Sequence, residues 1–102
     1  MDRRELVYAP RAQRDLLDLE EHYAAQVLAD LELLQRPPWP PGKVKKLPGT
    51  EYWEIKCGDF RAVFWPEGKS VVILRVVNRR DLAVAIKRID FRALLAWVRA
   101  AR

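Results

Sequence analysis

The sequence predicts an α+β domain whose elements follow the order β-αα-βββ-α. Three observations indicate this fold class. The 102 residues suit a single domain spanning 1–102, the first third shows a helical spacing of apolar residues, and the second half holds alternating and β-branched runs. We expect an antiparallel sheet with an N-terminal helical hairpin packed on one face and a C-terminal helix.

The first third of the chain is typical of a short strand followed by two helices. Residues 5–8 suit a strand, and Pro10 suits the first turn of a helix. From 11 to 36, apolar residues recur every three or four positions. So long a helix is unusual in a small domain, so we expect a break near 22–25. The segment PPWPPG at 37–42 then ends the second helix, because proline cannot continue it.

The segment YWEIKCGDFRAVFW predicts a β-hairpin with strands 52–57 and 60–65 around the turn Gly58-Asp59. Side chains alternate along a strand, so one face of the hairpin is apolar and suits the core, while the other carries polar and charged groups. The expected register pairs Cys57 with Phe60, Lys56 with Arg61, Glu54 with Val63 and Tyr52 with Trp65.

The last third of the chain predicts one more strand and a helical end. A turn at 66–69 leads to the β-branched strand 71–77, and a polar exit follows at 78–81. The patterns of 82–89 and 91–101 are helical, with a weak point between them that leaves open whether they form one helix.

Composition limits the classes of function. The chain is 50% hydrophobic and 32% charged with a net charge of +5, which suits a folded basic domain and favours a polyanionic partner. We expect a cytoplasmic protein, because neither a signal peptide nor a membrane span is evident. We expect Cys57 to lie in the core and His22 to be solvated, and we expect neither a metal site nor a cofactor.

The predicted sheet gathers cations. We place Ile73, Arg75 and Arg79 on the face of Arg61, because the opposite choice buries Arg75 unpaired beneath the helices. Lys56 shares this solvent-side face, and cations interleaved with aromatic rings suit RNA. The alternative is a solvated face without a ligand. Because like charges crowd there, Arg61→Ala should cost little stability. The other residues that we expect beside this cluster are Glu54, Tyr52, Lys45, Lys46 and Arg80.

Three segments match a known family pattern in order. YAPRAQRDLLDL matches an opening strand and helix, KVKKLPGTEYWEIKCGDFRAVFW matches a centre of the form K-x-L-x-G … Y-x-x-R … G-D-Y-R-V-x-[FY], and VVILRVVNRRD matches a closing strand with an H-R-K-D exit. Together they resemble the RelE/ParE superfamily of toxins from type II toxin–antitoxin systems. The resemblance spans nearly the whole chain and implies a RelE-like α+β fold.

The resemblance implies one of two activities. RelE-like members cut mRNA in the ribosomal A site, whereas ParE-like members share the fold and poison DNA gyrase. Lys56 matches the lysine of the RNase pattern, Arg61 its first arginine and Arg79 its second, with Arg80 as the adjacent alternative. Glu54 stands where a further lysine is usual, and the expected downstream tyrosine is missing near Ala83.

The chemistry that these matches imply is a 2′-hydroxyl attack on the adjacent phosphorus without a metal. Arg61 and Arg79 would hold the charge on the phosphorane, Lys56 or Glu54 would act as base, and Tyr52 is the nearby phenol that could act as acid. We expect an endoribonuclease that binds mRNA on the ribosome and a cognate acidic antitoxin. The alternatives are a non-enzymatic inhibitor whose target is DNA gyrase, and an inactive relative that still binds an antitoxin.

Overall fold

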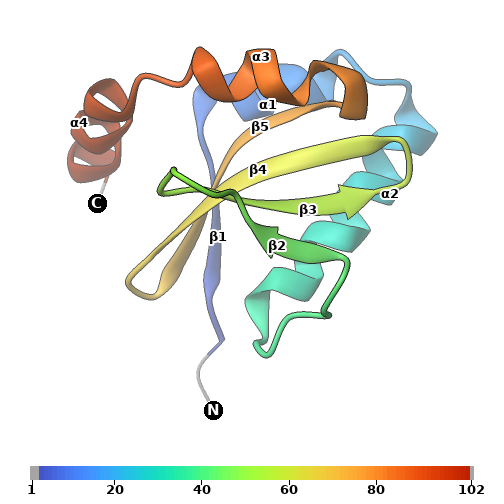
Figure 1. Ribbon diagram of the computed structural model, residues 1–102, viewed down its shortest axis with the longest axis horizontal. Coiled ribbons are helices and arrows are strands. Elements are labelled where there is room, and N and C mark those ends of the chain that lie inside the picture. Colours follow the sequence, from blue (N-terminus) through green and yellow to red (C-terminus); the bar gives the residue numbers. More distant parts are fainter. Residues whose placement is uncertain (1–2, 102) are drawn as a thin grey trace.

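The computed structural model describes residues 3–101 and shows a five-stranded mixed sheet in the order β1-β5-β4-β3-β2 (Figure 1). The strands are β1 (Glu5–Tyr8), β2 (Val44–Lys46), β3 (Trp53–Cys57), β4 (Phe60–Glu67) and β5 (Ser70–Asn78). The α-helices are α1 (Pro10–Leu17), α2 (Glu21–Leu31), α3 (Leu82–Lys87) and α4 (Phe91–Ala101). Two short 3-10 helices complete the fold, η1 (Glu32–Gln35) and η2 (Arg79–Asp81).

The N-terminal helical hairpin is present, but its break comes earlier than the predicted 22–25. Asp18 ends α1, and Glu20 has an extended backbone (φ −59°, ψ 147°) before α2 begins. The apolar spacing continues through the break because Leu19 still packs against the core beneath the helices. Periodicity alone therefore could not locate it. The second helix ends as the single turn η1, ahead of the prolines.

The predicted hairpin register is confirmed. β3 and β4 pair from Cys57 opposite Phe60 to Trp53 opposite Phe64, with Lys56 opposite Arg61. Gly58 adopts a positive φ of 61°, which a two-residue hairpin turn requires and which glycine adopts without steric cost. The expected pairing of Tyr52 with Trp65 falls outside the strand, because β3 begins at Trp53.

The sheet is mixed, which corrects the prediction of a purely antiparallel one. β1 runs parallel to β5, with partners from Glu5 and Ser70 to Tyr8 and Ile73. Parallel neighbours need a long crossover connection, and the two helices and three intervening strands supply it. The short strand β2 was not predicted. It pairs antiparallel with β3, and its sequence of one valine and two lysines carries too little pattern to identify it.

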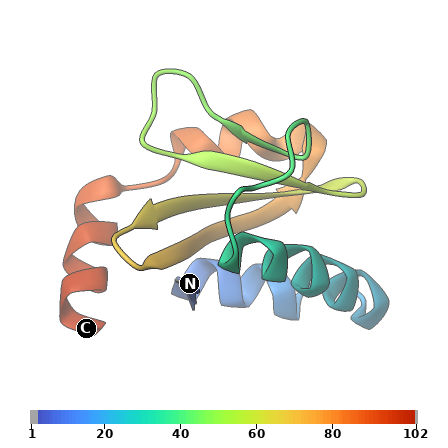
Figure 2. The same cartoon turned by 90° about the horizontal axis from the view of Figure 1, so that it is seen from below.

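Helices cover both faces of the sheet, whereas the sequence predicted one covered face. The first core cluster lies between the sheet and the α1–α2 pair, and the second joins the other face to α3 and α4. Figure 2 shows the α1–α2 pair along one side of the sheet with α4 standing at its end. The C-terminal helix is two helices, and Asp90 caps the second by accepting a hydrogen bond from the N–H of Ala93 at 3.1 Å.

A register shift between Val63 and Phe64 explains why the predicted face of β5 was half wrong. Arg75 pairs with Val63, but Ile73 pairs with Phe64, and so the side-chain alternation restarts at the bulge. Ile73 consequently packs under the α1–α2 pair with Phe64, while Leu74 packs with Val63 in the second cluster.

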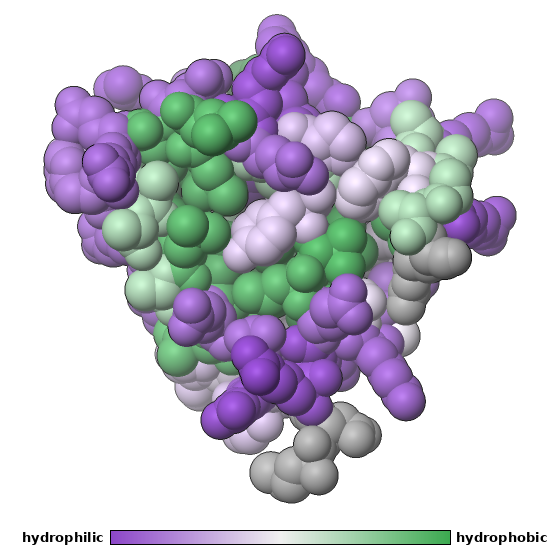
Figure 3. Space-filling model, turned by 180° about the vertical axis from the view of Figure 1, so that it is seen from behind, coloured by the Kyte–Doolittle hydropathy of each residue, from purple (hydrophilic) through white to green (hydrophobic). Residues whose placement is uncertain are grey.

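The outer surface of the α1–α2 pair carries exposed apolar side chains. Figure 3, the view from behind, shows this apolar area bordered by polar groups. Leu17 is 84% exposed, and Leu28 and Leu33 are also exposed.

Candidate functional site

Three of the predicted site residues meet at the tip of the β3–β4 hairpin. Lys56 lies opposite Arg61 across the hairpin, and Arg61 lies opposite Val77 on β5. Arg79 follows at the start of η2, where its N–H donates to the carbonyl of Asp59 in the hairpin turn at 2.9 Å. The hairpin turn and the exit of β5 therefore hold Lys56, Arg61 and Arg79 at one end of the sheet.

Arg61 is largely buried and has partners of its own. Its side chain is 14% exposed, and Nη1 donates to the carbonyls of Gly58 and Phe60, both at 2.9 Å. Its Nε lies 3.7 Å from Oε1 of Glu54, whose side chain is 4% exposed. Glu54 was expected on an open face, and it is instead half of a buried ion pair. The charge of Arg61 is thus partly neutralised inside the protein, and like-charge crowding with Lys56 is weaker than the sequence predicted.

Tyr52 is also buried, contrary to the expected solvent-side position. Its ring centroid lies 6.1 Å from that of Phe91, at the start of α4. Burial, together with the charges of Glu51 and Asp90, raises the pKa of the phenol. Tyr52 is 7% exposed and contributes to the second core cluster, so it presents no open surface for base stacking.

Arg75 is held by α1 rather than by the hairpin. Its Nε and Nη2 donate to the carboxylate of Asp15 at 2.8 and 3.3 Å, and the N–H of Val76 donates to the same carboxylate at 2.8 Å. β1 pairs with β5 only as far as Ile73. Beyond that point, the carboxylate of Asp15 accepts the hydrogen bond from the Val76 N–H. Sequence reasoning missed this partner because 60 residues separate the two side chains.

Five of the predicted cations remain exposed. Besides Lys46, four lie near the hairpin tip or along the neighbouring strand: Lys45, Lys56, Arg79 and Arg80. Within residues 3–101, no ion pair involves any of the four. Lys45 lies opposite Glu54, on the side of the sheet that Lys56 shares. Lys46 points to the other side and donates to the carbonyl of Thr50, so the predicted lysine pair is divided between the two faces.

The remaining reactive groups offer no second centre. Cys57 is 1% exposed, and burial raises the pKa of its thiol to about 12, which suits a core residue and not a nucleophile. The exposed His22 lies 3.6 Å from Glu20 on the far helix. In the described part of the chain, no cluster of three metal-ligating side chains occurs, and no helix is long and apolar enough to cross a membrane.

The geometry supplies more for phosphate binding than for proton transfer. Lys56 and Arg79 are free to contact a phosphate, and Arg61 is fixed with its charge close by. Glu54 is the carboxylate beside them, but it is buried and ion-paired. Ala83, where a tyrosine was expected from the resemblance, is an exposed alanine.

Solved structures of toxins share this architecture. The toxin–antitoxin complex RelBE2 from Mycobacterium tuberculosis matches with a TM-score of 0.67 and 26% identity over 78% of this chain and 94% of that one. A free-state mutant of Escherichia coli RelE matches at 0.66 and 19%, over 86% and 99%. A chromosomal ParDE system from Pseudomonas aeruginosa matches at 0.59 and 19%, over 74% and 95%. The fold is therefore that of RelE/ParE toxins.

The sequence comparison makes the assignment more specific. The family described as "ParE toxin of type II toxin-antitoxin system, parDE" matches residues 6–83, well over half of the chain. Comparison with curated proteins gives no match. The chain belongs to this toxin family, and it is a RelE/ParE-type toxin of a type II toxin–antitoxin system.

Proposed function

We propose that this toxin inhibits translation in the cytoplasm by cutting mRNA on the ribosome. The observation that carries the proposal is the meeting of Lys56, Arg61 and Arg79 at the hairpin tip. These residue types stabilise the charge that develops when a phosphodiester is attacked. The family likeness supports a toxin, and the arrangement of cations favours an RNA substrate.

In the proposed reaction, the ribose 2′-oxygen forms a bond to the adjacent phosphorus, and the bond to the 5′-oxygen breaks. A 2′,3′-cyclic phosphate and a 5′-hydroxyl result. Arg79 and Lys56 would contact the phosphate oxygens, with Arg61 held rigidly behind them. The 2′-hydroxyl proton would pass to Glu54, or to Lys56 if it starts as the neutral amine and leaves the phosphate to Arg79. The leaving oxygen takes a proton from a donor on the ribosome, since Tyr52 is buried.

A second candidate function is inhibition of DNA gyrase without catalysis. Two observations favour it: the pairing of Arg61 with Glu54, and the absence of a phenol at Ala83. A binding surface needs exposed cations but no acid–base pair. Lys56, Arg79 and their neighbours satisfy that requirement. A third outcome, an inactive relative that binds only an antitoxin, would show neither activity.

Primer extension on mRNA from a translating cell-free extract tests the proposal. Wild type should give discrete cuts, Lys56→Ala and Arg79→Ala should reduce them by about a hundredfold or more, and the distant exposed Arg36→Ala should not. A parallel supercoiling assay with purified gyrase tests the second function. Loss of supercoiling with intact mRNA would overturn the RNase proposal, and no effect in either assay would indicate the inactive relative.

We also propose an acidic antitoxin as the partner, because several structural neighbours are toxin–antitoxin complexes. The exposed cations of the hairpin tip suit pairing with carboxylates. A partly disordered acidic segment would fold over this surface, with Arg79 and the run 43–46 as its contacts. Arg61 should contribute less to antitoxin binding than the sequence predicted, because its Nε already lies beside the carboxylate of Glu54.

A further inference from the structure

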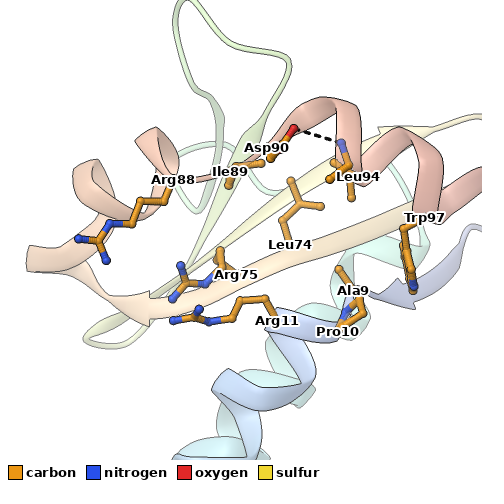
Figure 4. A pocket seen from close by; sticks show the side chains of 11 residues that line it. Ala9, Pro10, Arg11, Leu74, Arg75, Arg88, Ile89, Asp90, Leu94 and Trp97 are labelled. Atoms are coloured by element: carbon orange, nitrogen blue, oxygen red, sulfur yellow. Dashed lines mark hydrogen bonds between the residues drawn. The ribbon is translucent and has the colours of Figure 1, made fainter.

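Apolar surface outside the proposed RNA site occurs on either side of the sheet. A hollow of about 350 Å³ lies beside Trp97, and Figure 4 shows Arg88 and Asp90 among the side chains around it. Because this hollow carries charges of both signs side by side, its electrostatics select neither an acidic nor a basic occupant. The outer surface of α1, α2 and η1 is different, because its charges are separated along the helices.

The apolar side chains of this outer surface form a stripe along α2 and η1. Ala25, Leu28, Ala29 and Leu33 are all exposed, and spacings of three, four and eight residues from the first place them on one side of the helix. Leu28 is 40% exposed and Leu33 is 43% exposed. Leu17 at the end of α1 is 84% exposed and extends the stripe. A continuous apolar stripe of this kind is typical of a protein interaction surface.

The end of the stripe at the break between α1 and α2 is acidic. Asp18, Glu20 and Glu21 are exposed there, and the nearest cation on α1 is Arg14, one turn before Asp18. Glu20 lies 3.6 Å from His22, which is charged only when protonated. Three carboxylates beside one arginine leave this end of the surface negative.

The opposite end of the stripe, at η1, is basic. Arg36 is exposed directly after η1, and Nη2 of Arg3 donates to Oε1 of the neighbouring Gln35 at 3.3 Å. Glu32 is the acid at this end, so two guanidiniums stand beside one carboxylate. The same side chains line a hollow of about 340 Å³ together with Leu33.

This separation of charge suits a second copy of the chain. If two copies face each other with their α2 helices antiparallel, the acidic end of each copy meets the basic end of the other. The same two-fold arrangement brings Leu28 of both copies to the middle, and it brings Leu17 of each copy to the hollow beside Leu33 of the other. A polyanion is disfavoured because the acidic end would repel it, and the basic end would likewise repel a uniformly basic partner.

We propose that the outer surface of α1, α2 and η1 is the interface of a homodimer of the free toxin, with the two α2 helices antiparallel. Burial of the apolar stripe stabilises the dimer, and the charged ends fix the direction in which the helices run. The proposal does not depend on the proposed RNase function, because none of these side chains belongs to the RNA site.

Sedimentation velocity of the purified toxin without antitoxin, over about 1–200 µM, tests this interface. Wild type should shift from monomer to dimer as its concentration rises. R36E reverses the basic end and D18R/E21R reverses the acidic end, so each variant alone should dimerise at least about tenfold more weakly. An equimolar mixture of the two variants should recover nearly the wild-type affinity, because both ends of the mixed dimer again join opposite charges.

R99E is the matched control, because Arg99 is exposed on α4, which lies across the molecule from α2 in Figures 1 and 2. This variant should dimerise like wild type. L28E tests the apolar stripe separately and should also weaken the dimer by about tenfold or more.

Circular dichroism checks that each variant is folded, and R36E and L28E each test the interface without D18R/E21R. A wild-type monomer at about 200 µM, an unchanged dimer in folded R36E or L28E, or no recovery in a mixture of folded variants would each overturn the proposal. A monomeric toxin that loses antitoxin binding in L28E would assign the surface to the antitoxin instead.

Discussion

Arg61→Ala should destabilise the protein strongly, although the sequence predicted that it would cost little. The change leaves the carboxylate of Glu54, which is 4% exposed, without its cation. Breaking a buried pair from one side costs roughly 3–5 kcal/mol. The Nε–Oε1 distance of 3.7 Å and the remaining 14% exposure of Arg61 indicate the lower end. We therefore expect a loss of about 3 kcal/mol, or a fall in Tm of roughly 12–24 °C for a domain of this size.

Urea unfolding followed by circular dichroism measures this effect. Lys56→Ala is the matched control, because it removes the exposed cation directly opposite Arg61 and should change stability by no more than about 0.5 kcal/mol. Glu54→Leu combined with Arg61→Met should recover most of the loss, because it replaces both charges with apolar groups. If the free energy of unfolding of Arg61→Ala lies within about 0.5 kcal/mol of the wild-type value, the buried-pair reasoning is wrong.

Four further outcomes are expected. Iodoacetamide at about pH 8 should alkylate Cys57 far more slowly in native than in urea-unfolded protein, because burial raises its pKa to about 12; equal rates would contradict this. Asp15→Ala should cost about 2 kcal/mol in urea unfolding, because Arg75 and the N–H of Val76 lose their acceptor; an unchanged midpoint would contradict this. Burial raises the pKa of the Tyr52 phenol in the folded protein. The contribution of this residue to the free energy of unfolding should therefore be full below the unfolded pKa of about 10 and be lost as pH rises through the folded pKa, which lowers the urea midpoint. Affinity for the antitoxin should fall as salt rises, and a flat calorimetric profile would indicate an apolar interface instead.

The sequence predicted the hairpin well because its register is a local property. A two-residue turn at Gly58 fixes which residues face each other, so the pairing of Lys56 with Arg61 followed directly. The bulge between Val63 and Phe64 has no comparable local signal, and it reversed the expected face for Ile73. The parallel pairing of β1 with β5 also depends on chain segments that are far apart in sequence.

The candidate site was predicted in position but not in electrostatics. Lys56, Arg61 and Arg79 meet at the tip because strand pairing brings them there. Whether a cation is free depends on acids placed by tertiary packing, such as Asp15, which pairs with Arg75 from α1. A single sequence shows which residues are charged. It does not show that a carboxylate far away in the sequence neutralises a cation, because that depends on how the helices pack against the sheet.

This difference decides which substitutions can identify the site. Loss of toxicity in Arg61→Ala is ambiguous, because the variant also leaves Glu54 buried without its cation and lowers the folded population. Arg79 and Lys56 are exposed and without ion pairs within residues 3–101, so their removal leaves the fold intact. Lys56 lies on β3 at the hairpin tip, and Arg79 begins η2 beside it. The hydrogen bond from the N–H of Arg79 to Asp59 and the buried ion pair of Arg61 with Glu54 hold this region in place. A loss of activity at either position therefore reports target contact directly, and these two variants should be made before Arg61→Ala.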